Sequence, residues 1–284
     1  MAIKTVGIVG SGIMGAGIAQ CAALAGHEVV VRSRHPDSAT AVVEELARSL
    51  TGQVERGRLG EEDRAAAMAR LTATTELDRL GHCDLVIESV VEDLAAKKTV
   101  FRELDRVCPD GALLATNTST LPVVEMAMAT RRPEQVCGIH FFNPAPVMAL
   151  VEIVRPLTAS DETIAAARSF AVSLGKTAIE VEDRAGFVVN ALLFPYLNNA
   201  VRLVEEGVAT KEDVDRAMAG GCNFPMGPFA LLDLVGLDTS VSILEALYAE
   251  FNDPNYAPRP LLRRMVAAKH LGRKSGRGFY DYDR

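Results

Sequence analysis

The residues with the clearest capacity for chemistry are a histidine and a glutamate in successive apolar runs. His140 ends the run 136–140, and Glu152 lies within the run 148–154. An imidazole titrates near neutral pH, so it can accept and return a proton. A carboxylate inside an apolar strand is costly to bury without a partner. A lone histidine at a strand end is commonly structural, but the two together predict a proton-transfer pair in which the carboxylate orients the base.

A glycine-rich turn near the start of the chain predicts a dinucleotide site. The turn has the pattern G-x-G-x-x-G and stands between a strand-like run, 5–9, and a helical run, 13–25. Its first glycine permits a tight turn, the second lets the backbone approach a pyrophosphate, and the third allows close packing of helix on strand. The phosphates then lie at the helix N-terminus. The residues of the turn are Gly10, Ser11, Gly12, Ile13, Met14 and Gly15.

The end of the next strand-like run, 27–32, bears on the choice between NAD and NADP. NAD sites usually carry an acidic residue about 20 residues past the glycines, where it bonds the ribose 2′-hydroxyl. Here that position is Ser33, between Arg32 and Arg34. Without a carboxylate there is no repulsion of a 2′-phosphate, and two guanidinium groups with a hydroxyl can hold it. We therefore expect NADP(H), with NAD as the alternative if the arginines are solvated loop residues.

The elements that position these residues alternate along the first two thirds of the chain. A strand, a glycine turn, a helix and a second strand form a βαβ unit, which predicts a parallel sheet. Strand-like runs occur at 5–9, 27–32, 84–88, 112–116, 136–140, 148–154 and 177–181. Helical runs occur at 13–25, 94–107, 123–129 and 161–174, with an additional helical excursion at 38–57 and 60–69.

The pattern changes at Gly186, after which strand-like runs vanish. Helical runs follow at 187–207, 211–220, 229–251 and 260–270. We expect an α/β fold with a Rossmann-type, mostly parallel sheet, followed by an all-α C-terminal domain. The expected domains are 1–185 for dinucleotide binding and 186–284 for substrate binding and dimerisation. Several C-terminal helices are apolar around much of their circumference, which favours a homodimer.

The bulk composition narrows the class of protein. The 284 residues carry a formal net charge of −7, which argues against a nucleic-acid partner. The five cysteines are scattered and form no C-x-x-C pair, as is typical of reduced thiols in the cytoplasm. The histidines and acids show no metal-binding spacing, so we expect no metal. No run approaches the roughly 20 apolar residues of a membrane span.

Motifs along nearly the whole chain resemble the L-3-hydroxyacyl-CoA dehydrogenase family, especially its short bacterial 3-hydroxybutyryl-CoA dehydrogenases. The matching segments occur in the family's order, and several lie far from the glycine turn. They are GSGIMGAGIA, VIESVVEDLAAKK, ATNTSTL, HFFNPAPVMALVEIV, GFVVN, NFPMGPFALLDLVGLD and LGRKSGRGFYDY. The resemblance implies hydride transfer between a nicotinamide cofactor and a short-chain acyl-CoA substrate such as 3-hydroxybutyryl-CoA.

The resemblance also implies roles for individual residues. It implies a base, an orienting carboxylate and two ligands of the substrate oxygen: His140, Glu152, Ser119 and Asn190. It implies cofactor contacts beyond the glycine turn: Glu92, Lys97, Asn143 and Lys274. It implies contacts with the CoA substrate: Ser49, Arg56 and Lys97. The chain departs from the family's pattern at Ser33, at Ala149, where a lysine is common, and near Asn190.

Two other hypotheses remain open. The same chemistry could act on a hydroxyacyl group carried by an acyl carrier protein or on a free hydroxy acid. A protein of a different class, a non-catalytic dinucleotide-binding protein, could retain the fold. The intact set of Ser119, His140, Glu152 and Asn190 favours an enzyme.

Overall fold

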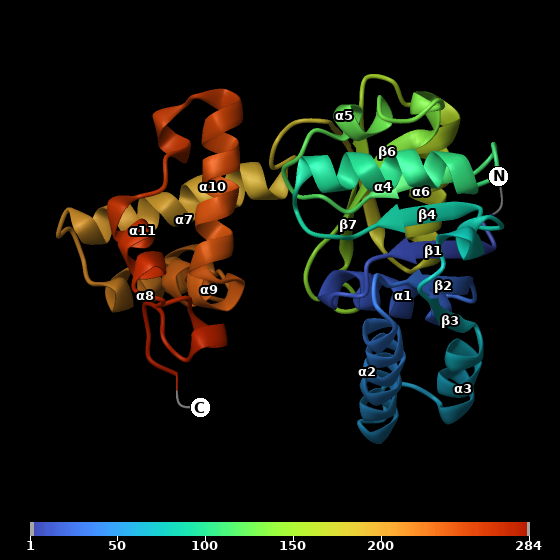
Figure 1. Cartoon of the computed structure of the whole chain (residues 1–284). Helices are drawn as coiled ribbons and strands as arrows, with labels where there is room; N and C mark the ends of the chain where they lie inside the picture. The colour runs from blue at the N-terminus through green and yellow to red at the C-terminus, as the bar shows by residue number, and fades with distance from the viewer. Residues whose placement is uncertain (1–2, 283–284) are drawn as a thin grey trace. The chain divides into compact units, whose positions relative to one another are not determined.

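The computed structural model describes residues 3–282. The chain divides after Asp183 into two compact units, residues 1–183 and residues 184–284. The first unit contains the sheet and the second is helical, which confirms the expected fold class (Figure 1). Within the described range, no helix is both long and apolar enough to cross a membrane.

The first unit is built on one sheet of eight strands within the described residues, in the order β3-β2-β1-β4-β5-β6-β7-β8. All neighbours are parallel except β6 and β7, which are antiparallel. The strands are β1 (Thr5–Val9), β2 (Glu28–Arg32), β3 (Leu71–Thr74), β4 (Leu85–Glu88), β5 (Leu113–Thr116), β6 (Val136–Phe141), β7 (Leu150–Arg155) and β8 (Thr177–Glu182).

Strand β3 is the one strand that the sequence pattern did not predict. Its four residues, Leu-Thr-Ala-Thr, are only partly buried or exposed because it is the edge strand next to β2. A short edge strand has neither a continuous apolar run nor a long alternation of apolar and polar residues. It therefore lacks the periodic pattern by which the other strands were predicted.

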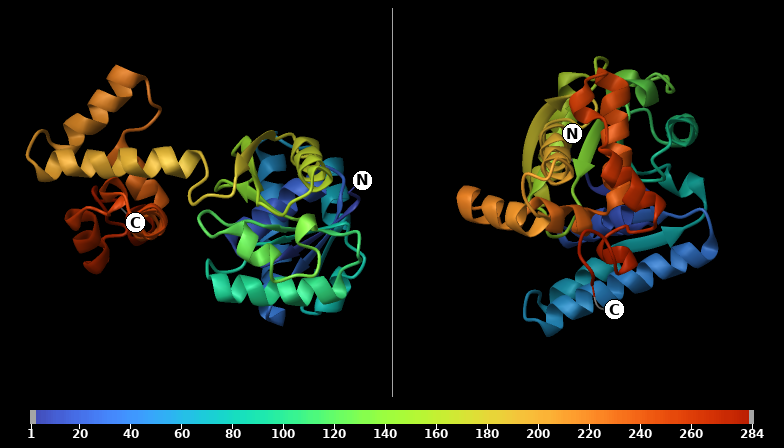
Figure 2. Two further views of the ribbon diagram at one scale, coloured as in Figure 1. Left: turned by 90° about the horizontal axis from the view of Figure 1, so that it is seen from above. Right: turned by 90° about the vertical axis from the view of Figure 1, so that its left-hand side faces the viewer.

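Helices cover both faces of this sheet. Helices α1 (Ile13–Leu24) and α6 (Asp161–Ser173) contribute to one apolar core with the strands. Helix α4 (Leu94–Val107) lies on the opposite face from α6, as both the front view and the view from above show (Figures 1 and 2). Helix α5 (Val123–Ala127) packs beside α4 and β6.

Two further helices form the excursion expected after the second strand. Helices α2 (Pro36–Glu55) and α3 (Glu61–Ala69) extend away from the body of the first unit (Figure 1). The described part of this unit also contains two short 3₁₀ helices, η1 (Leu77–Leu80) and η2 (Pro133–Gln135).

The second unit is a helical bundle with its own core. Phe194, Phe229, Leu232 and Leu244 are buried at its centre. Its α-helices are α7 (Val189–Glu205), α8 (Lys211–Cys222), α9 (Pro228–Val235), α10 (Leu237–Phe251) and α11 (Pro260–Ala267). Two 3₁₀ helices, η3 (Pro254–Tyr256) and η4 (Arg273–Ser275), complete its described helical elements.

The prediction of one helix over 229–251 was wrong, because the structure contains two helices there. Gly236 has φ +102°, a backbone conformation that residues with a Cβ rarely adopt. This glycine follows the last residue of α9 and precedes the first residue of α10. The apolar pattern continues on both sides of this glycine because both helices contribute to the same core.

A buried carboxylate holds the C-terminal segment of the second unit. Asp233, on α9, is 1% exposed. Its Oδ1 accepts a hydrogen bond from the backbone of Phe279 at 2.8 Å, and its Oδ2 accepts from the backbone of Tyr280 at 2.9 Å and the hydroxyl of Tyr282 at 3.0 Å. Three donors from one segment therefore converge on a single side chain of α9.

Candidate active site

The candidate site lies at the edge of the sheet where the parallel strands end. Strand β1 sits between β2 and β4, so the strand order reverses direction beside it. In open α/β sheets, ligands bind outside the carboxyl ends of the strands at such a switch point. The glycine turn follows β1, and the segments after β4 and β5 emerge at the same edge.

The glycine turn has the geometry that a dinucleotide pyrophosphate requires. Gly10 has φ +117°, and a Cβ there would lie 2.3 Å from the carbonyl oxygen of Ser89. A Cβ on Gly15 would lie 1.9 Å from the carbonyl oxygen of Gly10, so the helix packs directly on the turn. At Gly12, in contrast, a Cβ would meet nothing within 4 Å. Two glycines are thus required by the fold, and the third leaves open space for a ligand.

The end of β2 carries buried polar atoms that lack protein partners. Ser33 is 1% exposed, and its backbone N–H donates to the carbonyl oxygen of Thr74. The side-chain Oγ of Ser33 and the Nε of Arg32 are both buried and have no hydrogen-bond partner. A buried polar atom without a partner is costly. A ligand group with acceptor oxygens would satisfy both. The residues at this end of β2 therefore fit a dinucleotide, and Arg34 beside them is exposed.

The predicted proton-transfer pair is in direct contact. His140 on β6 lies opposite Glu152 on β7 in the antiparallel register. Nδ1 of His140 is 2.7 Å from Oε2 of Glu152, and the two residues are 4% and 0% exposed. A carboxylate accepts hydrogen bonds, so Nδ1 carries the proton and Nε2 presents its lone pair. The ring of Phe142 packs against the imidazole with centroids 4.6 Å apart.

Ser119 lies on the other side of the imidazole. Its Oγ is 3.3 Å from Nε2 of His140, so the hydroxyl and the base can share one substrate oxygen. The loop that carries Ser119 is held by Asn117, which sequence reasoning did not single out. Asn117 Oδ1 accepts from the backbone N–H of Phe141 at 2.9 Å, and its Nδ2 donates to Ser89 Oγ at 3.3 Å.

Glu92 and Lys97, both predicted to face the cofactor, have different surroundings. The Glu92 side chain is 41% exposed, whereas that of Lys97 is 0% exposed. The Lys97 ammonium lies 3.3 Å from Glu92 and is bonded to Glu88, a residue that the sequence did not single out. In this conformation Glu92 can reach a ligand, but Lys97 can affect one only through Glu92.

The remaining predicted residues of the first unit lie on its surface. Asn143 is exposed and precedes Pro144 through a cis peptide bond. Ser49, on α2, donates to Oε1 of Gln20 on α1 at 2.9 Å. Arg56 is exposed at the C-terminal end of α2.

Two predicted residues belong to the second unit. Asn190 is 7% exposed on α7. The Lys274 ammonium is 2.6 Å from the carboxylate of Asp238. Burial would raise the pKa of Asp238, but the hydrogen bond and charge of Lys274, together with backbone hydrogen bonds, hold that pKa below its usual value. Lys274 therefore forms an ion pair within its own unit.

The cysteines of the sheet unit are poor nucleophiles. Burial raises the pKa of Cys137 and of Cys83 to about 12, and that of Cys108 to about 11. Each therefore remains a protonated thiol at neutral pH. Among residues 3–282, no group of three or more His, Cys, Asp or Glu side chains is arranged to hold a metal ion.

Comparison with known proteins agrees with this fold. Residues 5–184 match the 3-hydroxyacyl-CoA dehydrogenase NAD binding domain, and residues 186–282 match the C-terminal domain of the same family. The chain is 50% identical to a 3-hydroxybutyryl-CoA dehydrogenase of Mycobacterium tuberculosis over 99% of each chain. It is 46% identical to a probable 3-hydroxybutyryl-CoA dehydrogenase of Bacillus subtilis over 100% of this chain and 99% of the relative.

A solved structure gives the same result. The (S)-3-hydroxybutyryl-CoA dehydrogenase of Ralstonia eutropha superimposes with a TM-score of 0.96 at 43% identity, over 100% of both chains. The fold and the site define a nicotinamide-dependent oxidoreductase. The chain belongs to the 3-hydroxyacyl-CoA dehydrogenase family.

Proposed function

We propose that this protein interconverts short-chain (S)-3-hydroxyacyl-CoA, such as 3-hydroxybutyryl-CoA, and the corresponding 3-ketoacyl-CoA. The observation that carries the proposal is the buried contact between His140 and Glu152, with Ser119 on the far side of the imidazole. The similar proteins named 3-hydroxybutyryl-CoA dehydrogenase support the substrate class.

The proposed mechanism assigns each side chain a task. A nicotinamide dinucleotide with its pyrophosphate at the glycine turn, 10–15, would supply the hydride acceptor for C3 of the acyl group and, in the reductive direction, the hydride donor. Nε2 of His140 takes the proton of the 3-hydroxyl group, and Glu152 stabilises the resulting imidazolium at Nδ1. Ser119 holds the substrate oxygen and offsets the charge that develops on it. Asn190 is assigned as a second oxygen ligand on the basis of the family resemblance alone.

A substrate panel tests the proposal. We expect acetoacetyl-CoA to be reduced with a much higher kcat/KM than acetoacetyl-carrier protein or free acetoacetate. Arg56→Ala should raise KM for acetoacetyl-CoA, because a CoA phosphate would lose a cation. Arg58→Ala, which removes a neighbouring exposed arginine, is the matched control and should leave KM unchanged. If the wild type is as inert as His140→Ala with every substrate and either cofactor, a non-catalytic dinucleotide-binding protein is favoured instead.

The proposal includes a preference for NADP(H) over NAD(H). The family description names NAD, so this preference would be particular to this chain. Its support is Ser33 in the place of an acid, with the unpartnered Oγ of Ser33 and Nε of Arg32 beside it. These groups suit a 2′-phosphate better than a 2′-hydroxyl.

Steady-state kinetics with NADH and NADPH test the preference directly. We expect a lower KM for NADPH in the wild type. Ser33→Asp should reverse the preference, because a carboxylate repels the 2′-phosphate and accepts a bond from the 2′-hydroxyl. A clear preference of the wild type for NADH refutes this part of the proposal.

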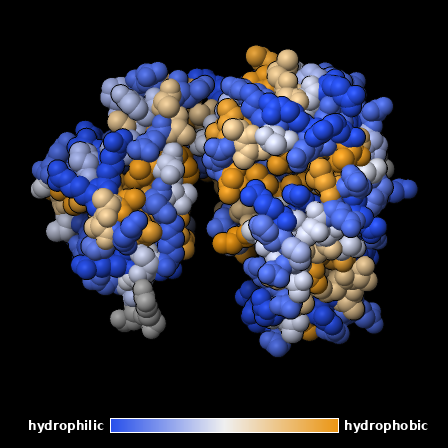
Figure 3. Space-filling model, in the orientation of Figure 1, coloured by the Kyte–Doolittle hydropathy of each residue, from blue (hydrophilic) through white to orange (hydrophobic). Residues whose placement is uncertain are grey.

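We assign dinucleotide binding to residues 1–185, and substrate binding and homodimerisation to residues 186–284, in a cytoplasmic protein. Large apolar side chains lie exposed on the helical unit, where the space-filling view shows hydrophobic and hydrophilic residues side by side (Figure 3). They include Leu192, Val208, Phe224 and Leu234. Burial against a second copy would remove this apolar surface from water. Light scattering that shows only monomer at micromolar concentration contradicts the dimer.

A further inference from the structure

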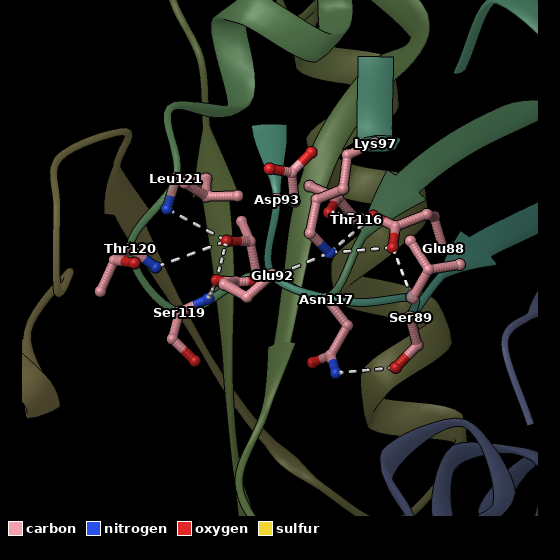
Figure 4. A network of polar contacts seen from close by, with 12 residues as sticks. Glu88, Ser89, Glu92, Asp93, Lys97, Thr116, Asn117, Ser119, Thr120 and Leu121 are labelled. Carbon is pink, nitrogen blue, oxygen red and sulfur yellow. Dashed lines mark hydrogen bonds and ion pairs between the residues drawn. The ribbon is translucent and has the colours of Figure 1, made fainter. Parts of the chain in front are cut away.

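The buried carboxylate of Glu88 has no role in the mechanism above, and yet it lies behind the candidate site. Glu88 ends β4 and is 0% exposed. Its two oxygens accept hydrogen bonds from the backbone N–H of Val90 at 2.6 Å and from Thr116 Oγ1 at 2.7 Å (Figure 4). The Lys97 ammonium donates to both oxygens, at 2.8 and 2.9 Å. An ion pair in the interior costs desolvation that an apolar pair would avoid, so it is weak evidence of a purely stabilising role.

The same ammonium connects Glu88 to the surface. Lys97 Nζ lies 3.3 Å from Oε2 of Glu92, whose side chain is 41% exposed. Two carboxylates thus share one buried cation, and their positions depend on each other. If Glu88 lost its charge, the full attraction of Lys97 would act on Glu92 and draw it inward.

The other oxygen of Glu92 holds the loop that carries the substrate ligand. Its Oε1 accepts from the backbone N–H of Ser119 at 2.9 Å and from the hydroxyl of Thr118. Ser119 Oγ in turn lies 3.3 Å from Nε2 of His140. A continuous series of contacts therefore leads from the interior of the sheet to the base. Its members in order are Glu88, Lys97, Glu92, Ser119 and His140.

We propose that Glu88 is a positioning residue for the reaction: through Lys97 and Glu92 it sets the place of Ser119 beside His140. This inference rests on the proposed function, because Ser119 and His140 matter only if they act on a substrate. Glu88 itself is 0% exposed, so it would act on the substrate only through these neighbours. Its charge, more than its volume, determines where the exposed carboxylate of Glu92 rests.

The variant Glu88→Gln tests this, since it removes the charge and keeps the shape. Misplacement of a reacting group by a fraction of an ångström is costly, so we expect kcat with acetoacetyl-CoA to fall about tenfold while KM stays within about twofold. Asp105→Asn is the matched control, because Asp105 is a buried carboxylate on the same helix as Lys97 and is paired with Arg131 and Arg132 outside the series. It should lower stability without lowering kcat.

A double-mutant cycle separates positioning from general destabilisation. If Glu88 acts through Glu92, the effects of Glu88→Gln and Glu92→Gln on kcat should be strongly non-additive. A double variant whose loss in kcat is the product of the two single losses overturns the proposal. So does a Glu88→Gln enzyme with the kcat of the wild type, or a control variant that loses as much kcat as Glu88→Gln.

A readout that needs no substrate keeps this inference distinct from the proposed function. In protein with ¹⁵N-labelled histidine, we expect the Nε2 signal of His140 to shift in Glu88→Gln and to stay in place in Asp105→Asn. If the wild type fails to reduce acetoacetyl-CoA, the proposed function fails. The Nε2 signal of His140 still tests whether Glu88 sets the surroundings of that imidazole. If Glu88→Gln does not fold, Thr116→Val removes one donor from the same carboxylate. An unshifted His140 signal in the folded variant overturns the inference.

Discussion

Two buried carboxylates, one in each unit, share backbone N–H and hydroxyl donors but differ in that Glu88 is also bonded to an ammonium group. Glu88 in the sheet is bonded to a lysine side chain that continues toward Ser119 and His140. Asp233 in the helical unit is bonded to two backbone N–H groups and a tyrosine hydroxyl of the C-terminal segment. Both are almost fully hidden from water. The difference teaches that burial alone does not reveal a role, whereas the identity of the partners does.

The largest effect that tests this contrast is expected at His140, the residue to which the contacts of Glu88 lead. We expect His140→Ala to lower kcat about a thousandfold, because a positioned base contributes roughly 10²–10⁴ in rate. Its melting temperature should also fall, because the buried Glu152 carboxylate loses its imidazole partner, so kcat is measured at a temperature where the variant is folded. His82→Ala, which removes an exposed histidine, is the control and should keep full activity. A His140→Ala enzyme with more than a tenth of the wild-type kcat contradicts the assignment of the base.

The second effect should appear in stability instead of rate. Asp233→Asn replaces one acceptor oxygen by an amide NH₂ that faces donors, so at least one buried donor loses its partner. We expect a loss of about 3 kcal/mol in the free energy of unfolding of the helical unit. Hydrogen exchange should report early opening at the backbone amides of Phe279 and Tyr280. Unchanged protection of these amides would show that the segment is held by other contacts.

A third, smaller effect contrasts two glycines of one turn. Gly12→Ala adds a methyl group where nothing lies within 4 Å, so the fold should be unaffected while KM for the dinucleotide rises about tenfold. Gly15→Ala puts a methyl group 1.9 Å from a backbone oxygen, so it should lower the melting temperature. Thermal melts and cofactor titrations of both variants measure the difference. Equal cofactor affinity in Gly12→Ala and the wild type contradicts the proposed path of the pyrophosphate.

The smallest effect concerns the pH dependence of stability. Burial raises the pKa of Asp105, but hydrogen bonds from Arg131 and Arg132 outweigh it, and the pKa lies below its usual value. This carboxylate therefore stabilises the fold above about pH 4, and the contribution is lost as pH falls through the folded-state pKa. We expect the stability gap between wild type and Asp105→Asn, measured by urea unfolding, to narrow below pH 4. A gap that is constant from pH 7 to pH 3 contradicts this pairing.

Much of the sheet was predictable because its signals are local. The glycine turn, the apolar strands and the helices between them follow from residues adjacent in the chain. The contact of His140 with Glu152 was also predictable, because a carboxylate in an apolar strand demands a partner. The break at Gly236 was missed because the apolar pattern continues across it, and only the backbone conformation reveals it.

The partners of Glu88 could not be predicted from the sequence, for a different reason. A glutamate at a strand end and a lysine on a charged helix are typical of solvated surfaces. Their burial depends on how α4 packs on the sheet, and Thr116 comes from yet another strand. Likewise, the place of Lys97 beneath Glu92 could not be read from the motif that contains both.

The antiparallel register of β6 and β7 has a consequence for how this site tolerates change. His140 and Glu152 face each other because two backbone ladders align them, so a slip of one residue would turn one side chain to the other face of the sheet. The connection at 142–149 does not set their distance. The alignment of the base with its carboxylate therefore depends on the two strands and would survive changes of sequence in the loop that joins them.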